Sequence, residues 1–431
     1  MKKTKNFFLK KKILVYGLGK SGISTYNFLK KRANLYIFDD NQKNIPKLNQ
    51  KQINYREIFK TEFDIIIISP GIDIANCKLS KYLKKNYSKI YTDLDVFYEF
   101  HKNHCITITG TNGKSTTCQL MFKVLSDQNL DVKLVGNIGN PILSARNIKK
   151  KTIFVVEASS YQLDYSKIFK SKYAAILNLS PDHLERHKTL KKYIQAKFKL
   201  LKNQNKNCTA FVNKDDFLIN REMKSIKLKS KVIRVVPKKQ NSIFKRLDNP
   251  YFSTETNREN LSFAIEISKK FKIKKEKMIK TIKNFKGLKY RQQIIFKNKG
   301  LTIINDSKST SFSSSLSILK SNQNIYWLLG GIHKKGDKFK LPKKYSSNIR
   351  AFIYGKRKKF FITNLKGKVR FENFSNIKNA LKKVIQIIKK NKFIEQTILF
   401  SPSAASFDSF KNFEDRGNYF DNLIKKYLNG I

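Results

Sequence analysis

The chain contains few cysteines, few acidic residues and no long apolar run. Its four cysteines are scattered without a CxxC pair, which argues against a disulfide framework or a zinc site and fits a reducing compartment. No apolar run is long enough to cross a bilayer, and the apolar patch in the opening MKKTKNFFLKKK is too short for a signal-peptide core. We therefore expect a cytoplasmic protein that does not insert into membranes.

Acidic residues are scarce relative to basic ones. The chain has 90 Lys and Arg but only 31 Asp and Glu, which gives a formal net charge of +59. Such a charge is typical of proteins that bind nucleic acid, and a nucleic-acid-stimulated ATPase is one alternative. However, the lysines are spread along the whole chain and Asn, Ile and Phe are also abundant, as a bias toward A/T-rich codons would produce. We favour this compositional explanation and expect no nucleic-acid partner.

The order of apolar segments predicts an α/β protein of three domains. A length of 431 residues suits two or three domains, and strands alternate with helical patterns throughout, which favours mostly parallel sheets. We predict an N-terminal Rossmann-like domain at 1–95, a central P-loop ATPase-like domain at 96–287 and a C-terminal Rossmann-like α/β domain at 288–431. The expected strands are Ile13–Tyr16, Leu35–Phe38, Asp64–Ser69, Ile153–Glu157, Ala174–Asn178, Leu301–Asn305, Ile325–Leu329, Ala351–Tyr354 and Thr397–Phe400.

The first domain begins with a glycine loop, Gly17-Leu18-Gly19-Lys20-Ser21-Gly22, placed between a strand and a helix. An acid, Asp39, ends the next strand at nearly the Rossmann spacing. Taken alone, this pattern is compatible with an NAD-dependent oxidoreductase. A glycine turn at a helix start also binds other pyrophosphates, including that of a UDP-sugar. Because the domain is short and a triphosphate loop follows it, we favour UDP over NAD.

The most informative stretch is the nucleotide loop Gly110–Thr116, GTNGKST, which joins an apolar strand to a helix. Its backbone N–H groups and the positive end of the helix converge on one point. Lys114 adds a cation for phosphate oxygens, and Ser115 or Thr116 offers a hydroxyl to Mg²⁺. The loop therefore predicts binding of a nucleoside triphosphate. Glu157 and His183 follow later strands and, with Ser115, are candidate ligands for Mg²⁺ or Mn²⁺.

Eight blocks in the chain resemble the Mur ligase family, in the same order. They are GTNGKST (110–116), GNIGNP (136–141), EASSYQL (157–163), NLSPDHLERH (178–187), QAKFKL (195–200), NDSKSTS (305–311), LLGG (328–331) and SPSAASFDSFKNFEDRG (401–417). The short loop TGTNGKST is also similar to that of folylpolyglutamate synthases. NDSKSTS and the last block are most similar to those of the family members that add D-glutamate. Another amino-acid ligase of the superfamily remains an alternative.

The resemblance implies a reaction and a set of site residues. The reaction is ATP-dependent addition of D-glutamate to UDP-N-acetylmuramoyl-L-alanine through an acyl phosphate, in peptidoglycan precursor synthesis, by an enzyme expected to be a monomer. The implied catalytic residues are Lys114, His183 and Lys197. Two Mg²⁺ ions would be held by Ser115, Glu157, His183 and Lys197, the last as a carbamate formed with CO₂. ATP would contact Gly110, Thr111, Asn112, Gly113, Lys114, Ser115, Thr116, Asn257, Arg291 and Asp306.

The remaining implied residues surround the other two substrates. The UDP-sugar would contact Gly17, Leu18, Gly19, Lys20, Ser21, Asp39, Gly71 and Asn137. The incoming D-glutamate would contact Lys308, Thr310, Lys334, Ser406, Phe407 and Phe413. The chain departs from the family pattern at Tyr290, where the family usually has His before Arg291, and at Thr256, where it usually has His before Asn257. Neither departure removes a charged group assigned to the site.

Overall fold

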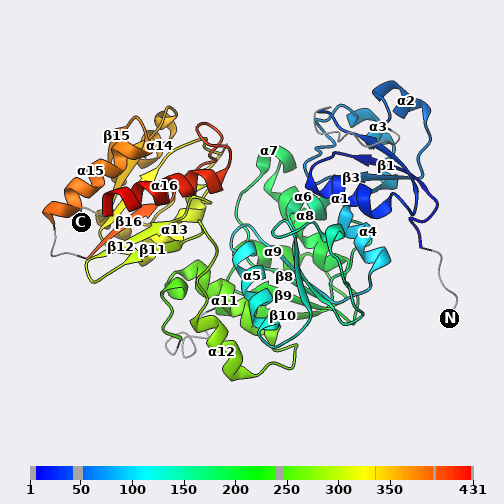
Figure 1. The fold of residues 1–431 in the computed structure, drawn as a ribbon, viewed down its shortest axis with the longest axis horizontal. Coiled ribbons are helices and arrows are strands. Elements are labelled where there is room, and N and C mark those ends of the chain that lie inside the picture. Colours follow the sequence, from blue (N-terminus) through cyan, green and yellow to red (C-terminus); the bar gives the residue numbers. More distant parts are fainter. Residues whose placement is uncertain (1–5, 42–51, 238–246, 335, 392–394, 429–431) are drawn as a thin grey trace. The chain divides into compact units, whose positions relative to one another are not determined.

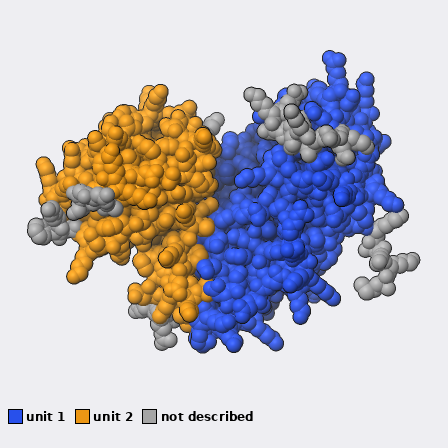
Figure 2. Space-filling model, viewed as in Figure 1, with its two compact units in different colours: residues 1–239, 262–278 blue, residues 240–261, 279–431 orange. Residues whose placement is uncertain are grey.

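The computed structural model describes residues 6–41, 52–237, 247–334, 336–391 and 395–428. The chain divides into two compact units, one made of residues 1–239 and 262–278 and the other of 240–261 and 279–431 (Figure 2). Within the described residues, the first unit contains two sheets and the second contains one. Three α/β sheets in sequence confirm the predicted fold class, whereas the boundaries 1–95, 96–287 and 288–431 stay predictions.

The N-terminal sheet is parallel, with strand order β2-β1-β3-β4. Its two inner strands, β1 and β3, are labelled in Figure 1. All four isoleucines of β3 are buried, as expected for a parallel sheet covered on both faces. The strands are β1 (Lys12–Tyr16), β2 (Asn34–Phe38), β3 (Ile65–Ile68) and β4 (Ile90–Tyr91), and the helices are α1 (Lys20–Leu29), α2 (Tyr55–Lys60), α3 (Ser80–Lys85) and α4 (Asp93–Phe100).

The central sheet has the order β10-β9-β8-β5-β7-β6, and all its pairings are parallel. Its strands are β5 (Cys105–Thr109), β6 (Val132–Gly136), β7 (Ile153–Glu157), β8 (Tyr173–Ile176), β9 (Thr209–Asn213) and β10 (Lys231–Val235). After β5 the chain builds β6 and β7 on one side and β8 to β10 on the other. The loops that follow β5, β7 and β8 therefore meet at a topological switch point, the usual place for a ligand in such sheets.

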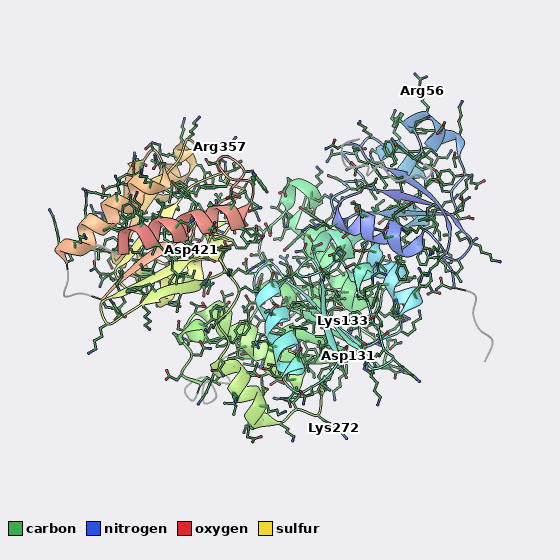
Figure 3. The ribbon with its side chains drawn as sticks, in the orientation of Figure 1. Arg56, Asp131, Lys133, Lys272, Arg357 and Asp421 are labelled. Carbon is green, nitrogen blue, oxygen red and sulfur yellow. The ribbon has the colours of Figure 1, made fainter. Side chains whose placement is uncertain are left out.

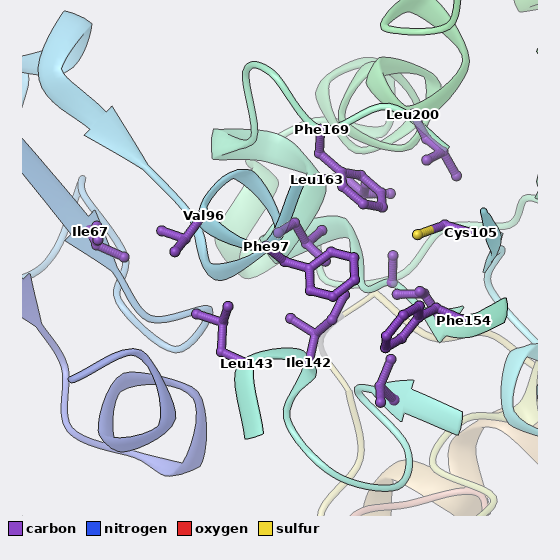
Figure 4. Packing of buried hydrophobic residues seen from close by; sticks show 14 of the residues in the cluster. Ile67, Val96, Phe97, Cys105, Ile142, Leu143, Phe154, Leu163, Phe169 and Leu200 are labelled. Carbon is purple, nitrogen blue, oxygen red and sulfur yellow. The ribbon is translucent and has the colours of Figure 1, made fainter. Parts of the chain in front are cut away.

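The helices that accompany the central sheet include α5 (Lys114–Ser126), α6 (Ser160–Tyr165), α7 (Leu184–His187), α8 (Leu190–Lys202) and α9 (Phe217–Lys224). A hydrophobic core joins this sheet to the N-terminal one (Figure 4). Ile67 and Val96 from the N-terminal sheet and α4 belong to the same buried cluster as Phe154 and Leu163. The rings of Phe97 and Phe154 pack with centroids 4.8 Å apart. This shared core explains why two sheets form one compact unit.

The second unit has a mixed sheet of order β11-β12-β16-β13-β14-β15, in which only the β11–β12 pairing among the described ones is antiparallel. Successive residues of a strand face opposite sides of the sheet. Residues from α13 and α14 pack against the strand residues of one face, and residues from α15 and α16 pack against those of the other, so both faces are covered. The elements are β11 (Gln293–Lys297), β12 (Leu301–Asn305), α13 (Phe312–Ser321), β13 (Ile325–Leu329), β14 (Ile349–Tyr354), α14 (Lys358–Leu365), β15 (Arg370–Phe374), α15 (Ile377–Lys390), β16 (Gln396–Phe400) and α16 (Phe413–Leu428).

Helices α11 (Glu255–Ser268) and α12 (Lys275–Lys283) each contribute residues to both units.

The buried carboxylate of Asp95 ties α4 to the central domain. Its Oδ1 accepts hydrogen bonds from Ser166 Oγ at 2.9 Å and from the backbone N–H groups of residues 167, 168 and 169 at 2.8–3.0 Å. Its Oδ2 accepts from the backbone N–H and hydroxyl of Thr92 at 3.0 and 3.1 Å. One carboxylate thus pairs six donors that would otherwise be buried without partners.

Asp95→Asn is expected to destabilise the first unit by about 3 kcal/mol, because the amide that replaces one oxygen points a donor at other donors. The measurement is hydrogen exchange of peptides containing residues 92–97 and 166–169 in increasing urea. Asp127→Asn is the matched control. It removes an exposed ion pair to Lys123 with an N···O distance of 3.9 Å, and a change of less than about 1 kcal/mol is expected. Equal exchange in the two variants would contradict the anchoring role.

Cationic side chains lie on many separate elements of both units (Figure 3). Arg56 on α2, Lys133 on β6 and Lys272 after α11 belong to the first unit, and Arg357 precedes α14 in the second. This spread agrees with a compositional origin for the positive charge, and the expected lack of a nucleic-acid partner stays a prediction. In the described part of the chain, no helix combines the length and apolarity that a membrane span needs.

Candidate active site

The nucleotide loop leaves β5 at the centre of its sheet and ends at the first turn of α5. Gly110 and Gly113 have φ values of 154° and 81°, which side chains with a Cβ rarely adopt. Ser115 and Thr116 are buried at the start of α5. Lys114 Nζ donates to the carbonyls of Gly110 at 2.9 Å and Thr111 at 2.8 Å. The predicted loop is thus formed as a strand–turn–helix unit, with its lysine folded back over it.

Two neighbours that the sequence prediction did not include hold the nucleotide loop in place. Asn178, in the loop after β8, accepts from the N–H of Asn112 at 2.8 Å, and its own carbonyl accepts from the N–H of Thr111 at 2.9 Å. The hydroxyls of Tyr193 and Thr111 share a hydrogen bond of 2.9 Å. Tyr193 precedes Lys197 by four residues on α8, so both side chains lie on one face of that helix. This i,i+4 spacing could have revealed Tyr193 in the sequence.

Lys197 projects from α8 to the base of the nucleotide loop. Its side chain is buried, and Nζ donates to the Gly110 carbonyl at 2.8 Å and to Thr109 Oγ1 at 3.3 Å. Burial, followed by the charge of Lys114, holds the pKa of this amine well below its usual range, although Asp182 and Glu157 act in the opposite direction. A lysine in such an environment is available as a neutral nucleophile.

Glu157 ends β7 and is buried beside Asn137. Its Oε1 accepts from Asn137 Nδ2 at 2.8 Å, and its backbone carbonyl accepts from the Asn137 N–H at 2.9 Å. Among the described residues, its buried Oε2 has no hydrogen-bond partner. A buried carboxylate oxygen without a partner is costly unless a ligand or ion completes its bonding. The structure therefore joins a predicted sugar-site residue directly to a predicted metal ligand.

His183 stands at the start of α7 in a left-handed conformation, with φ of 54°. Its Nδ1 shares a hydrogen bond of 2.7 Å with the hydroxyl of Tyr161, and its Nε2 lies 3.4 Å from Asp182 Oδ2. Burial raises the pKa of Tyr161 to about 12, so the phenol stays protonated at neutral pH. Such a partner on one ring nitrogen orients the other toward a ligand.

Arg186 connects this histidine loop to the N-terminal domain. Its guanidinium lies over the ring of Tyr161 at 4.7 Å and donates to the carbonyls of Gly71, at 3.4 Å, and Ile72. Its Nε is 3.7 Å from a carboxylate oxygen of Asp73. Gly71 of the predicted sugar-nucleotide site, together with the two residues that follow it, is thereby attached to the helix that follows His183. Sequence reasoning missed Arg186 because nothing local shows that residues 71–73 lie opposite it.

The glycine loop of the first domain is shaped by Asp39. A Cβ at Gly22 would lie 1.8 Å from the carbonyl oxygen of Gly17, so that position requires glycine. The buried carboxylate of Asp39 accepts from the backbone N–H groups of Leu18 at 2.5 Å and Asn41 at 2.8 Å. Lys20 is exposed at the start of α1, and Ser21 beside it is half-buried. Asp39 therefore has a clear part in shaping the loop, and its contact with UDP stays a prediction.

In the second unit, the predicted ATP residues Asn257 and Asp306 are linked through Gln292. Asn257 Nδ2 donates to Gln292 Oε1 at 3.0 Å, and the Gln292 N–H donates to Asp306 Oδ1 at 3.0 Å. Ser401 Oγ donates to Asp306 Oδ2 at 2.8 Å. Burial raises the pKa of the Asp306 carboxyl to about 7, against these hydrogen bonds and the charge of Arg291. Gln292 was not predicted, because it lies outside the recognised blocks.

The residues assigned to D-glutamate come from segments that follow β12, β13 and β16. Lys308 Nζ lies 3.8 Å from the centre of the Phe413 ring, which places a cation over an aromatic face. Ser406 is buried, Thr310 and Lys334 are half-buried, and Phe407 is 72% exposed. The structure thus confines these six residues to the carboxyl ends of one sheet, while their contact with an amino acid stays a prediction.

The chain also matches two sequence models of known domains. The Mur ligase middle domain matches residues 108–286, and the Mur ligase MurD-like N-terminal domain matches residues 11–90. The chain belongs to the Mur ligase family. The resemblance to this family that the sequence blocks indicated is therefore confirmed.

This Mur ligase is similar over nearly its whole length to several relatives named UDP-N-acetylmuramoylalanine--D-glutamate ligase. The protein from Rickettsia bellii is 33% identical over 440 residues, covering 96% of this chain and 97% of the relative. The protein from Caldicellulosiruptor bescii is 31% identical over 457 residues, with 97% and 98% covered. The protein from Francisella tularensis subsp. novicida is 32% identical, with 96% and 95% covered.

Solved structures confirm the fold of this Mur ligase. MurF from Thermotoga maritima in complex with ADP superimposes with a TM-score of 0.58 at 14% identity, covering 87% of this chain and 91% of that one. UDP-N-acetylmuramate-alanine ligase MurC from Thermotoga maritima gives a TM-score of 0.53 at 15% identity, with 98% and 100% covered.

One departure from the family pattern has a visible structural counterpart. Tyr290 adopts φ of 61°, and its carbonyl accepts from the Lys308 N–H at 3.0 Å. Its ring lies against Gly417, where an added Cβ would be 2.3 Å from the Tyr290 Cδ1 atom. The Tyr290 ring therefore occupies space that a side chain at 417 would fill.

Proposed function

We propose that this Mur ligase joins D-glutamate to UDP-N-acetylmuramoyl-L-alanine at the expense of ATP. The observation that carries the choice of substrates is the similarity, over at least 95% of each chain, to relatives named for that reaction. The geometry supports the reaction class, because the nucleotide loop, Lys114, Lys197 and Glu157 gather at the switch point of the central sheet. The expected monomeric state and cytoplasmic location remain part of the proposal.

The first half of the reaction brings two anions together. The carboxylate of the sugar-linked alanine attacks the γ-phosphorus of ATP, the bond to the β-phosphate oxygen breaks, and an acyl phosphate and ADP result. Lys114 and the N–H groups of the nucleotide loop would neutralise charge on the transferred group. The Arg186 bridge would hold residues 71–73, and with them the sugar nucleotide, in register with this loop.

The residues present fit a bound Mg²⁺. Glu157 Oε2 is buried without a described partner, Ser115 supplies a hydroxyl, and Mg²⁺ prefers such oxygen ligands with phosphate oxygens and water. In the described part of the chain, no group of three or more His, Cys, Asp or Glu side chains is arranged to hold a metal. A carbamate on Lys197 would supply the missing carboxylate, with His183 as a further ligand. When bound, Mg²⁺ would offset negative charge on the phosphates.

In the second half, the neutral amine of D-glutamate attacks the acyl carbon, and phosphate leaves from a tetrahedral intermediate. Lys308 and Lys334 would act as point charges for the carboxylates of the amino acid. The ring of Phe413 limits the positions open to the Lys308 ammonium. The amino acid would thus be selected by charges at the carboxyl end of the third sheet.

Phosphate release tests this proposal directly. The purified full chain is mixed with ATP, Mg²⁺ and UDP-N-acetylmuramoyl-L-alanine, and D-glutamate is compared with L-glutamate and with other amino acids. We expect release only with D-glutamate, together with a product that contains one more glutamyl residue. Release with a different amino acid would assign another ligase of the superfamily, and stimulation by DNA or RNA would favour the ATPase alternative.

Tyr161→Phe is expected to weaken Mg²⁺ activation by about 10- to 100-fold, because it removes the hydroxyl that pairs with His183 Nδ1. The concentration of Mg²⁺ that gives half-maximal ADP release is the kinetic measurement, and Mn²⁺ binding followed by electron paramagnetic resonance is independent of turnover. Tyr165→Phe is the control, since Tyr165 also lies beneath Arg186, 5.7 Å from its guanidinium. Equal Mn²⁺ affinity in both variants would show that the Tyr161 hydroxyl does not orient a ligand.

A further inference from the structure

A cavity of about 290 Å³ in the first unit is lined by residues that are not assigned to the active site. One wall is the carboxyl-terminal half of α1 with Arg32 in the turn after it, and the other is the segment 143–148. His101, which follows α4, also lines the cavity. Its lining includes Phe28, Arg32, His101, Leu143, Arg146 and Ile148. None of these residues belongs to the predicted ATP, metal or substrate sets.

The charged residues of this cavity are unusual for this chain. The sequence has 77 lysines and only 13 arginines, yet the described residues that line the cavity include two arginines and no lysine. They include no acidic residue either. Compositional bias toward lysine does not produce this selection. Arginine differs from lysine in presenting a planar fork of donors that matches carboxylate and phosphate oxygens.

Both guanidinium groups retain donors for a ligand. Arg32 lies over the ring of Phe28 at 4.5 Å and donates through one terminal nitrogen to the Phe28 carbonyl, which holds its plane in place. Among the described residues, its Nε and other terminal nitrogen have no partner, and Arg146 makes neither a hydrogen bond nor an ion pair. The cavity is thus lined by one arginine whose guanidinium plane is fixed and by one whose guanidinium makes no described hydrogen bond or ion pair.

The rest of the lining suits an apolar body with a few polar contacts. Phe28, Leu143, Ala145 and Ile148 supply apolar surface, and the Leu143 side chain lies at the edge of the shared core (Figure 4). Burial and the charge of Arg32 lower the pKa of His101, so its ring is neutral at pH 7. A neutral histidine adds no competing charge and can donate or accept one hydrogen bond.

We propose that this Arg32–Arg146 cavity binds a small organic oxyanion, a carboxylate or a phosphate monoester carried on an apolar body. Its volume is at the lower end of the range for small-molecule sites, about 300–1,000 Å³, which limits the ligand to roughly one ring with its anionic group. The proposal does not depend on the ligase activity, since it rests on residues outside that site.

Fluorine NMR of the full chain tests it with three probes: 4-fluorophenyl phosphate, 4-fluorobenzoate and the neutral 4-fluorobenzyl alcohol. ADP and Mg²⁺ are kept in excess to occupy the nucleotide loop. We expect saturable binding of one or both anions, with the stronger one identifying the oxyanion, and no competition by the alcohol. The absence of saturable binding of either anion up to about 10 mM would overturn the proposal.

Variants assign any binding to this cavity. Arg146→Gln is expected to weaken it by about tenfold, as loss of a charge-assisted hydrogen bond predicts, and it should fold normally because Arg146 has no described contact to lose. Arg56→Gln removes the same charge from an exposed position on α2 and should change nothing. Ala145→Trp, which fills the cavity and keeps both arginines, should abolish binding. Equal affinity in the wild type, Arg146→Gln and Ala145→Trp would place the ligand elsewhere.

Discussion

Replacing Lys197 with alanine is expected to abolish amide formation, with a loss of about 10³-fold or more in kcat. The amine is buried at the base of the nucleotide loop, and burial lowers its pKa, which favours the neutral form. In that form it can add to CO₂ and release a proton, which turns the neutral amine into an anionic carbamate. The variant cannot make this change. A second Mg²⁺ would therefore lack a negatively charged ligand beside Glu157.

Three measurements separate this role from simple packing. Lys197→Met keeps most of the buried volume and should be as inactive as Lys197→Ala, whereas Lys202→Ala, an exposed change on the same helix, should be fully active. A carbamate signal from ¹³C-bicarbonate should appear in the wild type and be missing in both Lys197 variants. Activity should fall as the pH drops through the lowered pKa of the amine, because protonation removes the form that reacts with CO₂. Near-normal ADP release by Lys197→Met would refute the metal-bridging role.

Lys114→Ala is expected to reduce ADP release by about 10²- to 10³-fold or more, since it removes the cation that we propose to neutralise the transferred phosphoryl group. In the structure its ammonium donates to two carbonyls of the nucleotide loop, at 2.8 and 2.9 Å, so it is held where the phosphates are expected. The loop conformation depends mainly on Gly110, Gly113 and the contacts of Asn178, and these remain in the variant. The loss should therefore appear in catalysis more than in folding.

The control for Lys114 is Lys123→Ala, which removes an exposed lysine from the same helix. Wild-type, Lys114→Ala and Lys123→Ala proteins are compared for kcat, for KM of ATP and for thermal stability. A fall in kcat for Lys114→Ala, with unchanged melting, supports charge stabilisation of the transition state. Unchanged kcat would contradict it. Lys114→Ala should also raise the affinity of Lys197 for a proton, because it removes a neighbouring positive charge.

Strand prediction succeeded where both faces of a strand are buried. Ile153–Glu157, Leu301–Asn305 and Ile325–Leu329 were predicted with the boundaries that the structure has. The strands missing from the prediction include β4, β6, β10, β11 and β15, all at the edges of their sheets. Four of them, β6, β10, β11 and β15, are largely half-exposed or exposed and carry polar residues, so no apolar run marks them. β9 is an exception, since it is interior and fully buried.

The parts of the candidate site that depend on adjacent residues could be read from the sequence. The nucleotide loop is one strand–turn–helix segment, and its glycines, lysine and hydroxyls act within seven positions. The glycine loop of the first domain is local in the same way. The bonds of Asn137 to Glu157, Tyr161 to His183 and Arg186 to residues 71–73 could not be read in this way, because each joins segments that are far apart in the chain or depends on where a loop turns.

Local order along the chain was enough to establish the α/β class, the nucleotide loop and the family, since backbone conformation and helix direction depend on near neighbours. Folding in three dimensions decided which side chains became chemically distinctive. The lowered pKa of Lys197, the Glu157 oxygen that has no partner among the described residues and the raised pKa of Asp306 all arise from removal of water. The cost of removing water depends on everything packed around a group, and segments distant in sequence supply most of that packing.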